Sequence, residues 1–330
     1  GSSPGSNGVV QDYPSVRVVG NVLPPEILPA VSAHRLPRMS AGDYNLPLGM
    51  TPDNAAAHAY NYLQSVWQAW NHRLSTAAQA GEDVAALTRE QWLMPLLKHL
   101  GYEDDVAAVS TKRGITILTG FQDEKVTYPV SHEVIHARDQ HDKVCAALPI
   151  HLVSPEINLD ERPTGDRSSR AAHSMLQEFL NRTPTRLYGL LTNGHTLRLL
   201  RDVTNLDRQA YLEFDLEGIF QGDHYATFSI LFRLLHASRF APRPGANDPA
   251  SCLFEQAAAH ASSTAIRALE TLRGNIEQAL KDLGTGFLRH GPLRQRLREG
   301  TLGRRDYHQQ LVRMLYRLLF LFIAEDRGLL

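Results

Sequence analysis

The feature that most constrains the fold is the closing segment, residues 311–330, whose sequence is Leu-Val-Arg-Met-Leu-Tyr-Arg-Leu-Leu-Phe-Leu-Phe-Ile-Ala-Glu-Asp-Arg-Gly-Leu-Leu. Its pattern is that of a helix apolar on most of its circumference, and such helices are buried inside a larger body. No later residue of the chain could cover it. We therefore expect this chain to be the front part of a longer protein, with a further domain that covers the helix and carries the chemistry.

The composition is typical of a globular protein of two or three domains. The chain has 330 residues, of which 43% are hydrophobic and 21% are charged, and both values are ordinary. Its formal net charge is −1, so no overall field draws it to nucleic acid or to a membrane. Any basic surface must therefore be local.

Cysteine usage and hydropathy indicate a cytoplasmic protein with no membrane partner. Cys145 and Cys252 lie far apart and match no zinc-binding spacing, which favours reduced thiols. The uncharged apolar run at residues 318–324 is much shorter than the roughly 20 residues that a bilayer span needs.

Proline, glycine and periodicity divide the chain into four parts and predict the α+β class. Residues 1–50 are rich in Pro, Gly and Ser and are expected to form an extended arm. Residues 51–110 have helical periodicity, with a kink or break expected at Pro95. Residues 111–242 mix strand and helix patterns, and after a proline-rich linker residues 250–330 are helical.

Within the mixed part, apolar runs predict strands and one hairpin. Asn193-Gly194 separates two such runs, and this dipeptide is the strongest short hairpin signal because its turn needs positive φ. One helix is expected between the second and third of the strands, and another after the last strand. The expected strands are residues 114–119, 146–153, 187–192, 196–201 and 209–214, and the expected helices are residues 168–182 and 225–238.

His132-Glu-Val-Ile-His136 matches the HExxH pattern of zinc metalloproteases. On a helix the two imidazoles would share one face and Glu133 could act as general base. Pro129 and the β-branched Val134 and Ile135 favour a strand instead. A strand would separate the two imidazoles by about 13 Å, too far to share one metal ion.

Two further motifs each have a simple structural explanation. Residues 282–288, Asp-Leu-Gly-Thr-Gly-Phe-Leu, resemble a glycine-rich turn for S-adenosylmethionine, but they follow a long helical pattern, not the strand that such a turn requires. Asp123-Glu-Lys125 supplies the Asp-x-Lys variant of a PD-(D/E)xK nuclease site, with Asp104 or Asp105 as the upstream acid. A solvated hairpin turn explains this tripeptide equally well.

Residues 289–305 hold six arginines and one acidic residue. Guanidinium groups match phosphate geometry, so this segment could contact a DNA backbone. It could equally be a solvated helix face that pairs with acidic residues elsewhere.

Five segments together resemble the N-terminal region of large DNA adenine methyltransferases of the type IIG restriction–modification kind. They are residues 173–182, 188–201, 211–220, 272–284 and 315–327, the last being Leu-Tyr-Arg-Leu-Leu-Phe-Leu-Phe-Ile-Ala-Glu-Asp-Arg. The resemblance spans about residues 90–330. It is closest to the methyltransferase of the DISARM phage-defence system and more distant to that of the BREX system.

The resemblance implies a nuclease-like α/β domain at residues 111–242 and a helical scaffold leading to an absent methyltransferase domain. In the family, that later domain carries an Asn-Pro-Pro-Tyr-type motif that clamps the adenine. This chain has no such motif. The resemblance thus implies S-adenosylmethionine as cofactor of the parent enzyme, with no cofactor, metal or catalytic residue in this chain.

We therefore expect an accessory part of a bacterial DNA adenine-N6 methyltransferase that contacts duplex DNA and other defence-system subunits. A divergent Mg²⁺-dependent nuclease or an HExxH zinc protease is the alternative, and a pure interaction module that docks through residues 1–50 and the closing helix is a third. The candidate phosphate contacts are Arg198, Arg201, Arg294, Arg296, Arg298, Arg304 and Arg305.

Overall fold

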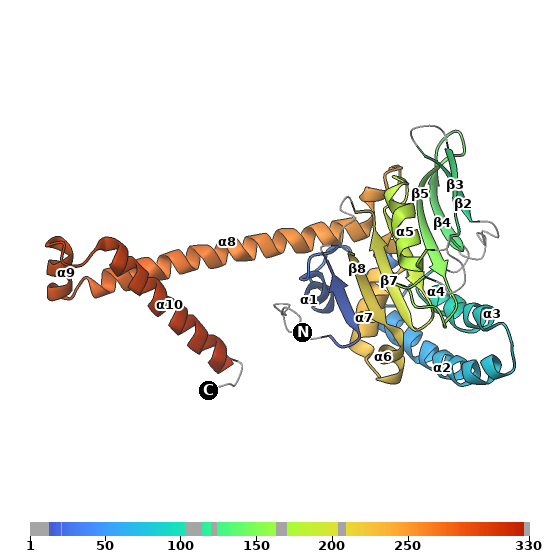
Figure 1. The fold of residues 1–330 in the computed structure, drawn as a ribbon, viewed down its shortest axis with the longest axis horizontal. Coiled ribbons are helices and arrows are strands. Elements are labelled where there is room, and N and C mark those ends of the chain that lie inside the picture. Colours follow the sequence, from blue (N-terminus) through green and yellow to red (C-terminus); the bar gives the residue numbers. More distant parts are fainter. Residues whose placement is uncertain are drawn as a thin grey trace. The chain divides into compact units, whose positions relative to one another are not determined.

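The computed structural model describes residues 13–20, 22–102, 114–119, 124–162, 170–203 and 209–326. The chain divides into two compact units, residues 1–262 and residues 263–330. Unit 1 is mixed α+β, as expected, and is built around a six-stranded sheet (Figure 1). From edge to edge the sheet contains β1 (Val16–Val19), β8 (Tyr211–Asp215), β7 (Thr196–Arg201), β6 (Tyr188–Thr192), β5 (Val144–Leu152) and β4 (His132–Arg138).

One neighbouring pair in this sheet is parallel. β5 and β6 run in the same direction, whereas the other four neighbouring pairs are antiparallel. Parallel neighbours need a crossover connection, and α5 (Ala172–Asn181) lies between the two strands in the chain. A separate two-stranded sheet consists of β2 (Ile115–Thr119) and β3 (Glu124–Tyr128).

The expected hairpin joins β6 to β7, but its turn differs from the prediction. Gly194 has φ of +91°, whereas Asn193 does not have positive φ. The Asn193 side chain instead accepts hydrogen bonds from the backbone N–H groups of His195 and Thr196, at 3.1 and 2.9 Å. The loop therefore closes as a side-chain-capped turn.

Helices cover both faces of the main sheet. One face packs in the larger core with α1 (Ile27–Ser32), α2 (Pro52–Gln79), α6 (Leu216–Gln221) and α7 (Tyr225–Leu235). The other face packs against α5 and the β2–β3 hairpin in a smaller core that includes Tyr128 and Phe179. Tyr128 also donates a hydrogen bond to Glu178 on α5, at 3.0 Å.

The prediction of an extended arm at residues 1–50 is wrong for the residues that the structure describes. β1 pairs with β8 along its whole length. Ile27 and Val31 on α1 have no exposed surface, and a short 3-10 helix, η1 (Gly42–Tyr44), follows. β1 and α1 are both short and lie in a proline-rich stretch. The strand pattern at Val16–Val19 and the single turn of apolar residues at 27–31 are therefore difficult to detect in the sequence.

Residues 51–102 are mainly helical, and a π-helical turn comes just before Pro95, where the sequence predicts a kink or break. Thr51 caps α2 by accepting a hydrogen bond from the Asn54 N–H at 3.2 Å. After α3 (Val84–Thr88), a π-helical turn, η2 (Arg89–Leu93), leads into α4 (Met94–His99), in which Pro95 occupies the first turn. Proline has no N–H to donate and is tolerated in a first helical turn. These helices share the larger core with the sheet, so they form no separate domain.

Unit 2 contains the distal part of α8 (Leu253–Phe287), then α9 (Gly291–Arg298) and α10 (Arg304–Asp326). The unit boundary lies inside α8 and not in the proline-rich stretch at 242–249, because Phe254, Ala257 and Ala261 are buried in the core of unit 1. α8 continues past Gly284 to Phe287. Within the described ranges, no helix combines the length and apolar character needed to cross a membrane.

Candidate nucleic-acid interface

The arginine segment forms α9 and the first turn of α10. Pro292 lies in the first turn of α9, where its missing N–H costs nothing, and Gly300 follows the helix with φ of +75°. At 100° per residue, Arg294 and Arg298 lie on one flank of α9 and Arg296 lies on the other. All three side chains are exposed.

Arg304 and Arg305 are exposed in the first turn of α10. The N-terminus of a helix carries partial positive charge, so two arginines there destabilise the helix by about 0.3–1 kcal/mol each. Helix stability therefore gives no reason for their position. Binding of a negatively charged ligand would give a reason for two arginines at this position.

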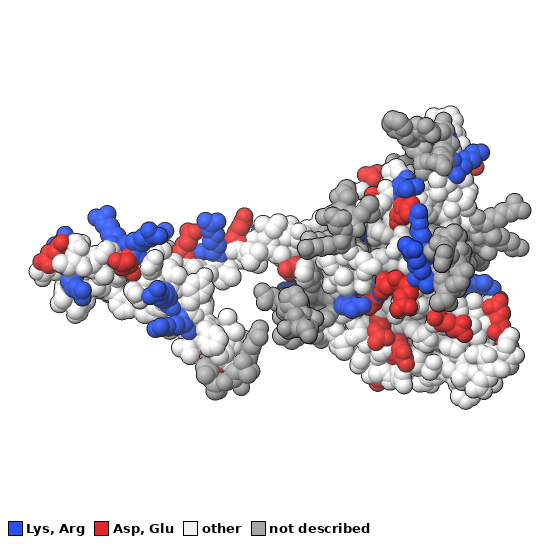
Figure 2. Space-filling model, in the orientation of Figure 1, with Lys and Arg blue, Asp and Glu red and all other residues white. Residues whose placement is uncertain are grey.

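The charge of this segment is concentrated and unpaired. Residues 289–317 contain eight arginines and two acidic residues, although the whole chain has a net charge of −1. Figure 2 shows basic side chains along the helices of unit 2, with acidic side chains among them. Among the described residues, none of the five guanidinium groups at 294, 296, 298, 304 and 305 takes part in an ion pair or a side-chain hydrogen bond.

Arg198, by contrast, is removed from the candidate set by its burial. Its side chain is 5% exposed, and its Nε donates to Glu213 at 2.6 Å while Nη1 and Nη2 donate to Asp160 at 2.7 Å each. Burial acts to lower the pKa of Arg198, but the hydrogen bonds to Asp160 and Glu213 outweigh it and hold the pKa above its ordinary value. This guanidinium has no free donor face for a phosphate.

Arg201 is also engaged inside unit 1. Its Nε and Nη2 donate to the two carboxylate oxygens of Glu255 at 2.9 and 3.2 Å. The Tyr188 hydroxyl donates to the same carboxylate. Since Glu255 lies in the first turn of α8, the expected phosphate contact at Arg201 is instead a link between β7 and that helix.

The Arg198 network was missed in the sequence, although part of it could have been found. Arg198 and Glu213 are directly opposite in the β7–β8 register, so a correct strand alignment predicts their pairing. Asp160 lies in a loop about 40 residues upstream of Arg198, and no local pattern connects them. His173 completes the network with Nδ1 3.1 Å from Nη1 of Arg198.

The HExxH segment lies on strand β4, as the local sequence predicts. His132 is buried and its Nδ1 lies 2.9 Å from the Ser131 hydroxyl. Glu133, the would-be general base, accepts a hydrogen bond from Nε of Arg186 at 2.5 Å, with both side chains buried. Nothing in this arrangement favours a zinc protease.

The other two motifs give no site either. Residues 282–287 are the last turns of α8, so the glycine-rich stretch is helical and follows no strand. Asp104, Asp105 and Asp123 lie outside the described residues, and Lys125 is on the separate β2–β3 sheet. Within the part of the chain that the structure describes, no group of three His, Cys, Asp or Glu side chains could hold a metal ion.

No family model matches this chain, and no curated protein or solved structure matches it. Arg294, Arg296, Arg298, Arg304 and Arg305 are therefore interpreted from their geometry and charge.

Proposed function

We propose that this chain is the accessory N-terminal part of a bacterial DNA adenine-N6 methyltransferase of a restriction–modification or phage-defence system. Its own role is to bind the phosphate backbone of duplex DNA through Arg294, Arg296, Arg298, Arg304 and Arg305. The parent enzyme uses S-adenosylmethionine in the cytoplasm, and other defence subunits are its partners. The link to methylation comes from the sequence resemblance, and the DNA contact comes from the arginines.

The observation that carries the DNA contact is a cluster of arginines without carboxylate partners. Several exposed arginines elsewhere in the chain do have such partners, for example Arg73 with Glu82 at 3.1 Å. Among the described residues, Arg294, Arg296, Arg298, Arg304 and Arg305 have none, although they lie within one short stretch of the chain. Unpaired guanidinium groups attract phosphate oxygens and release the counterions condensed on DNA.

The spacing suits a backbone contact more than the reading of bases. Arg294 and Arg298 are four residues apart, which is about 6 Å along the helix, and Arg296 reaches from the opposite flank. One helix can thus contact phosphates on both sides of its axis. Contacts of this kind position a protein on DNA and give no sequence information directly, which fits an accessory role.

The test is duplex binding by a variant with all five arginines changed to glutamine, measured by fluorescence anisotropy. We expect binding by the unmodified chain and a loss of about 100-fold in affinity for the variant at roughly 0.1 M salt. Binding that is unchanged in this variant would remove the five residues from the proposal.

A matched control removes the same number of charges from exposed arginines that already have carboxylate partners. These are Arg38, Arg73, Arg89, Arg138 and Arg273. We expect this control to bind DNA with an affinity within about threefold of the unmodified chain. The charge of a paired guanidinium is largely offset by its carboxylate partner, so it attracts DNA phosphates only weakly. Equal losses in both variants would indicate a nonspecific effect of net charge.

A further inference from the structure

The apolar side chains of helix α10 include two sets that point in different directions, here called the inner and the outer stripe. The inner stripe, Leu311, Leu315, Leu318 and Phe322, faces α8. The outer stripe consists of Tyr316, Phe320 and Ile323, which are 69%, 71% and 53% exposed. At 100° per residue the centres of the two stripes are about 130° apart around the helix. Both stripes are buried only if a neighbour packs on each of them.

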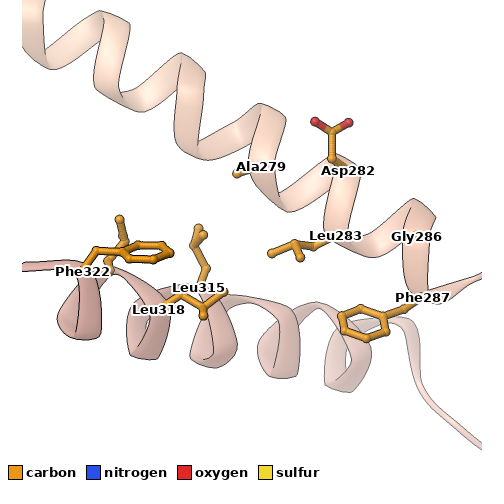
Figure 3. A pocket seen from close by; sticks show the side chains of 9 residues that line it. Ala279, Asp282, Leu283, Gly286, Phe287, Leu315, Leu318 and Phe322 are labelled. Atoms are coloured by element: carbon orange, nitrogen blue, oxygen red, sulfur yellow. The ribbon is translucent and has the colours of Figure 1, made fainter. Parts of the chain in front are cut away.

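Within unit 2, α8 packs against the inner stripe of α10, but it covers only part of that stripe. Near α9, the Tyr307 hydroxyl donates to the Gly284 carbonyl at 2.7 Å, and Leu311 lies against Gly284. Beyond this point α8 and α10 diverge and leave an apolar cavity of 690 Å³ between them (Figure 3). Leu283 and Phe287 line it from α8, and Leu315, Leu318 and Phe322 line it from α10.

The apolar stripe of α8 also continues past the part that faces α10. Leu269, Leu272, Ile276 and Leu283 recur at spacings of three, four and seven residues on one face of α8. Leu269 and Leu272 are 65% and 52% exposed. Both helices therefore leave apolar surface uncovered in the described chain, and the two surfaces are of similar length.

We propose that a second copy of this chain, and not the further domain expected from the sequence, covers these surfaces. The outer stripe of α10 in each copy packs on the exposed stripe of α8 in the other, so that two helical hairpins form a four-helix bundle. In such a bundle each helix touches two neighbours and buries a wide apolar arc. The contact is reciprocal, as a twofold dimer requires.

The charges beside the stripes support a second copy as the occupant. Arg313 and Arg317 are one turn apart beside the outer stripe of α10 and are exposed. Glu270 and Glu277 lie along one side of the α8 stripe and are also exposed, and one oxygen of Glu277 accepts a hydrogen bond from Nε of Arg273 within α8 at 3.1 Å. A copy of the same chain thus brings acidic side chains to the arginines at both reciprocal contacts, as in coiled-coil pairing.

The available area is sufficient for a dimer. Six exposed apolar side chains from each copy would be covered, namely Ile266, Leu269, Leu272, Tyr316, Phe320 and Ile323. At roughly 100 Å² each, the two copies together bury about 1,200 Å². This is the lower end of the range for specific interfaces, so we expect a dimer at micromolar concentrations.

The first test is the mass of the full chain in solution by sedimentation. The chain has a mass of 36.8 kDa, and we expect twice that mass at about 50 μM. Phe320→Glu combined with Ile323→Glu should weaken the dimer at least about 100-fold. Leu48→Glu with Leu118→Glu, at exposed apolar positions of unit 1, is the control and should remain dimeric.

The second test is charge reversal, which distinguishes the proposed pairing from a general apolar effect. Arg313→Glu with Arg317→Glu should dissociate the dimer, and adding Glu270→Arg with Glu277→Arg should restore it. Circular dichroism verifies that each variant keeps its helices. A monomer at about 100 μM, a dimer that survives F320E/I323E, or reversal without restoration would each overturn the proposal.

The dimer and the DNA contact are separable in these experiments. The five-arginine variant should remain a dimer, because those residues lie outside both stripes. F320E/I323E should still bind a short duplex as a monomer.

Discussion

Arg198 and Asp160 form a two-point ion pair, in which Nη1 and Nη2 of the arginine each donate to one carboxylate oxygen at 2.7 Å. The same guanidinium donates to Glu213. Arg198→Gln leaves Glu213 without its buried partner, so we expect a loss of about 3 kcal/mol in the free energy of unfolding. Urea unfolding followed by tryptophan fluorescence measures this, because Trp67, Trp70 and Trp92 are all buried in unit 1.

Arg17→Gln is the control for that change. Arg17 donates to the other oxygen of Glu213 at 2.6 Å, but its side chain is 55% exposed. Solvent screens such a pair, and its loss should cost less than about 1 kcal/mol. Equal losses at positions 17 and 198 would contradict the structural role given to Arg198.

Three histidines predict a loss of stability in mild acid: His173 and His236, which are buried, and His151, which is half-buried. Burial lowers the pKa values of His151, His173 and His236 to about 4, below the value of about 6.5 in an unfolded chain. Between these two pH values the unfolded chain binds more protons, so stability is complete above pH 6.5 and is lost as the pH falls towards 4. Each histidine contributes a slope of up to about 1.4 kcal/mol per pH unit.

His236→Asn isolates one of the three. The Asn oxygen can replace Nδ1 of His236 as acceptor for the Ser238 N–H, which lies at 3.2 Å, and it cannot be protonated. We expect the slope of unfolding free energy against pH to fall by about 1 kcal/mol per pH unit near pH 5. An unchanged slope would show that His236 does not titrate in this range.

Two glycine-to-alanine changes should have opposite effects. Gly194 has φ of +91°, and a Cβ there would lie 2.9 Å from Thr88 and 3.3 Å from Trp70, so Gly194→Ala should destabilise unit 1 by about 1–3 kcal/mol. Gly274 is inside α8, and a Cβ there would have open space within 4 Å. Gly274→Ala should stabilise that helix by about 0.5–1 kcal/mol. Thermal melts followed by circular dichroism compare the two.

Because of the position of Arg304 and Arg305, their replacement should change the stability of α10 and the affinity for duplex DNA in opposite directions. Removing two positive charges from the N-terminus of α10 should stabilise that helix by about 0.6–2 kcal/mol in total. The same change, Arg304→Gln with Arg305→Gln, should weaken duplex binding about tenfold. If helix stability fell instead, these arginines would have a structural role that the described contacts do not explain.

Most elements of unit 1 could be predicted from local sequence. The apolar runs around Leu190, Leu199 and Leu212 give strands at their expected places, and a π-helical turn lies just before Pro95, where the sequence predicts an irregularity in the helix. The order of strands in the sheet could not be predicted, because the pairing of β1 with β8 joins residues almost 200 positions apart. The sequence does not specify such a long-range pairing locally.

The candidate site was less predictable than the fold. The sequence treats Arg198 and Arg296 alike, since both are arginines next to leucines in polar-flanked segments. Their difference lies in carboxylates supplied from elsewhere: Asp160 and Glu213 reach Arg198, and none reaches Arg296 among the described side chains. Whether an arginine is free to bind a phosphate therefore depends on its tertiary contacts, which the local sequence does not show.

The most direct test of the DNA contact is the dependence of duplex affinity on salt concentration. Each neutralised phosphate contributes a slope of about −0.9 in log affinity against log salt. If Arg294, Arg296, Arg298, Arg304 and Arg305 each neutralise one phosphate, their replacement by glutamine should make the slope shallower by about 4 to 5. An identical slope in the unmodified chain and in this variant, or no binding of duplex by the unmodified chain at low salt, would contradict the account.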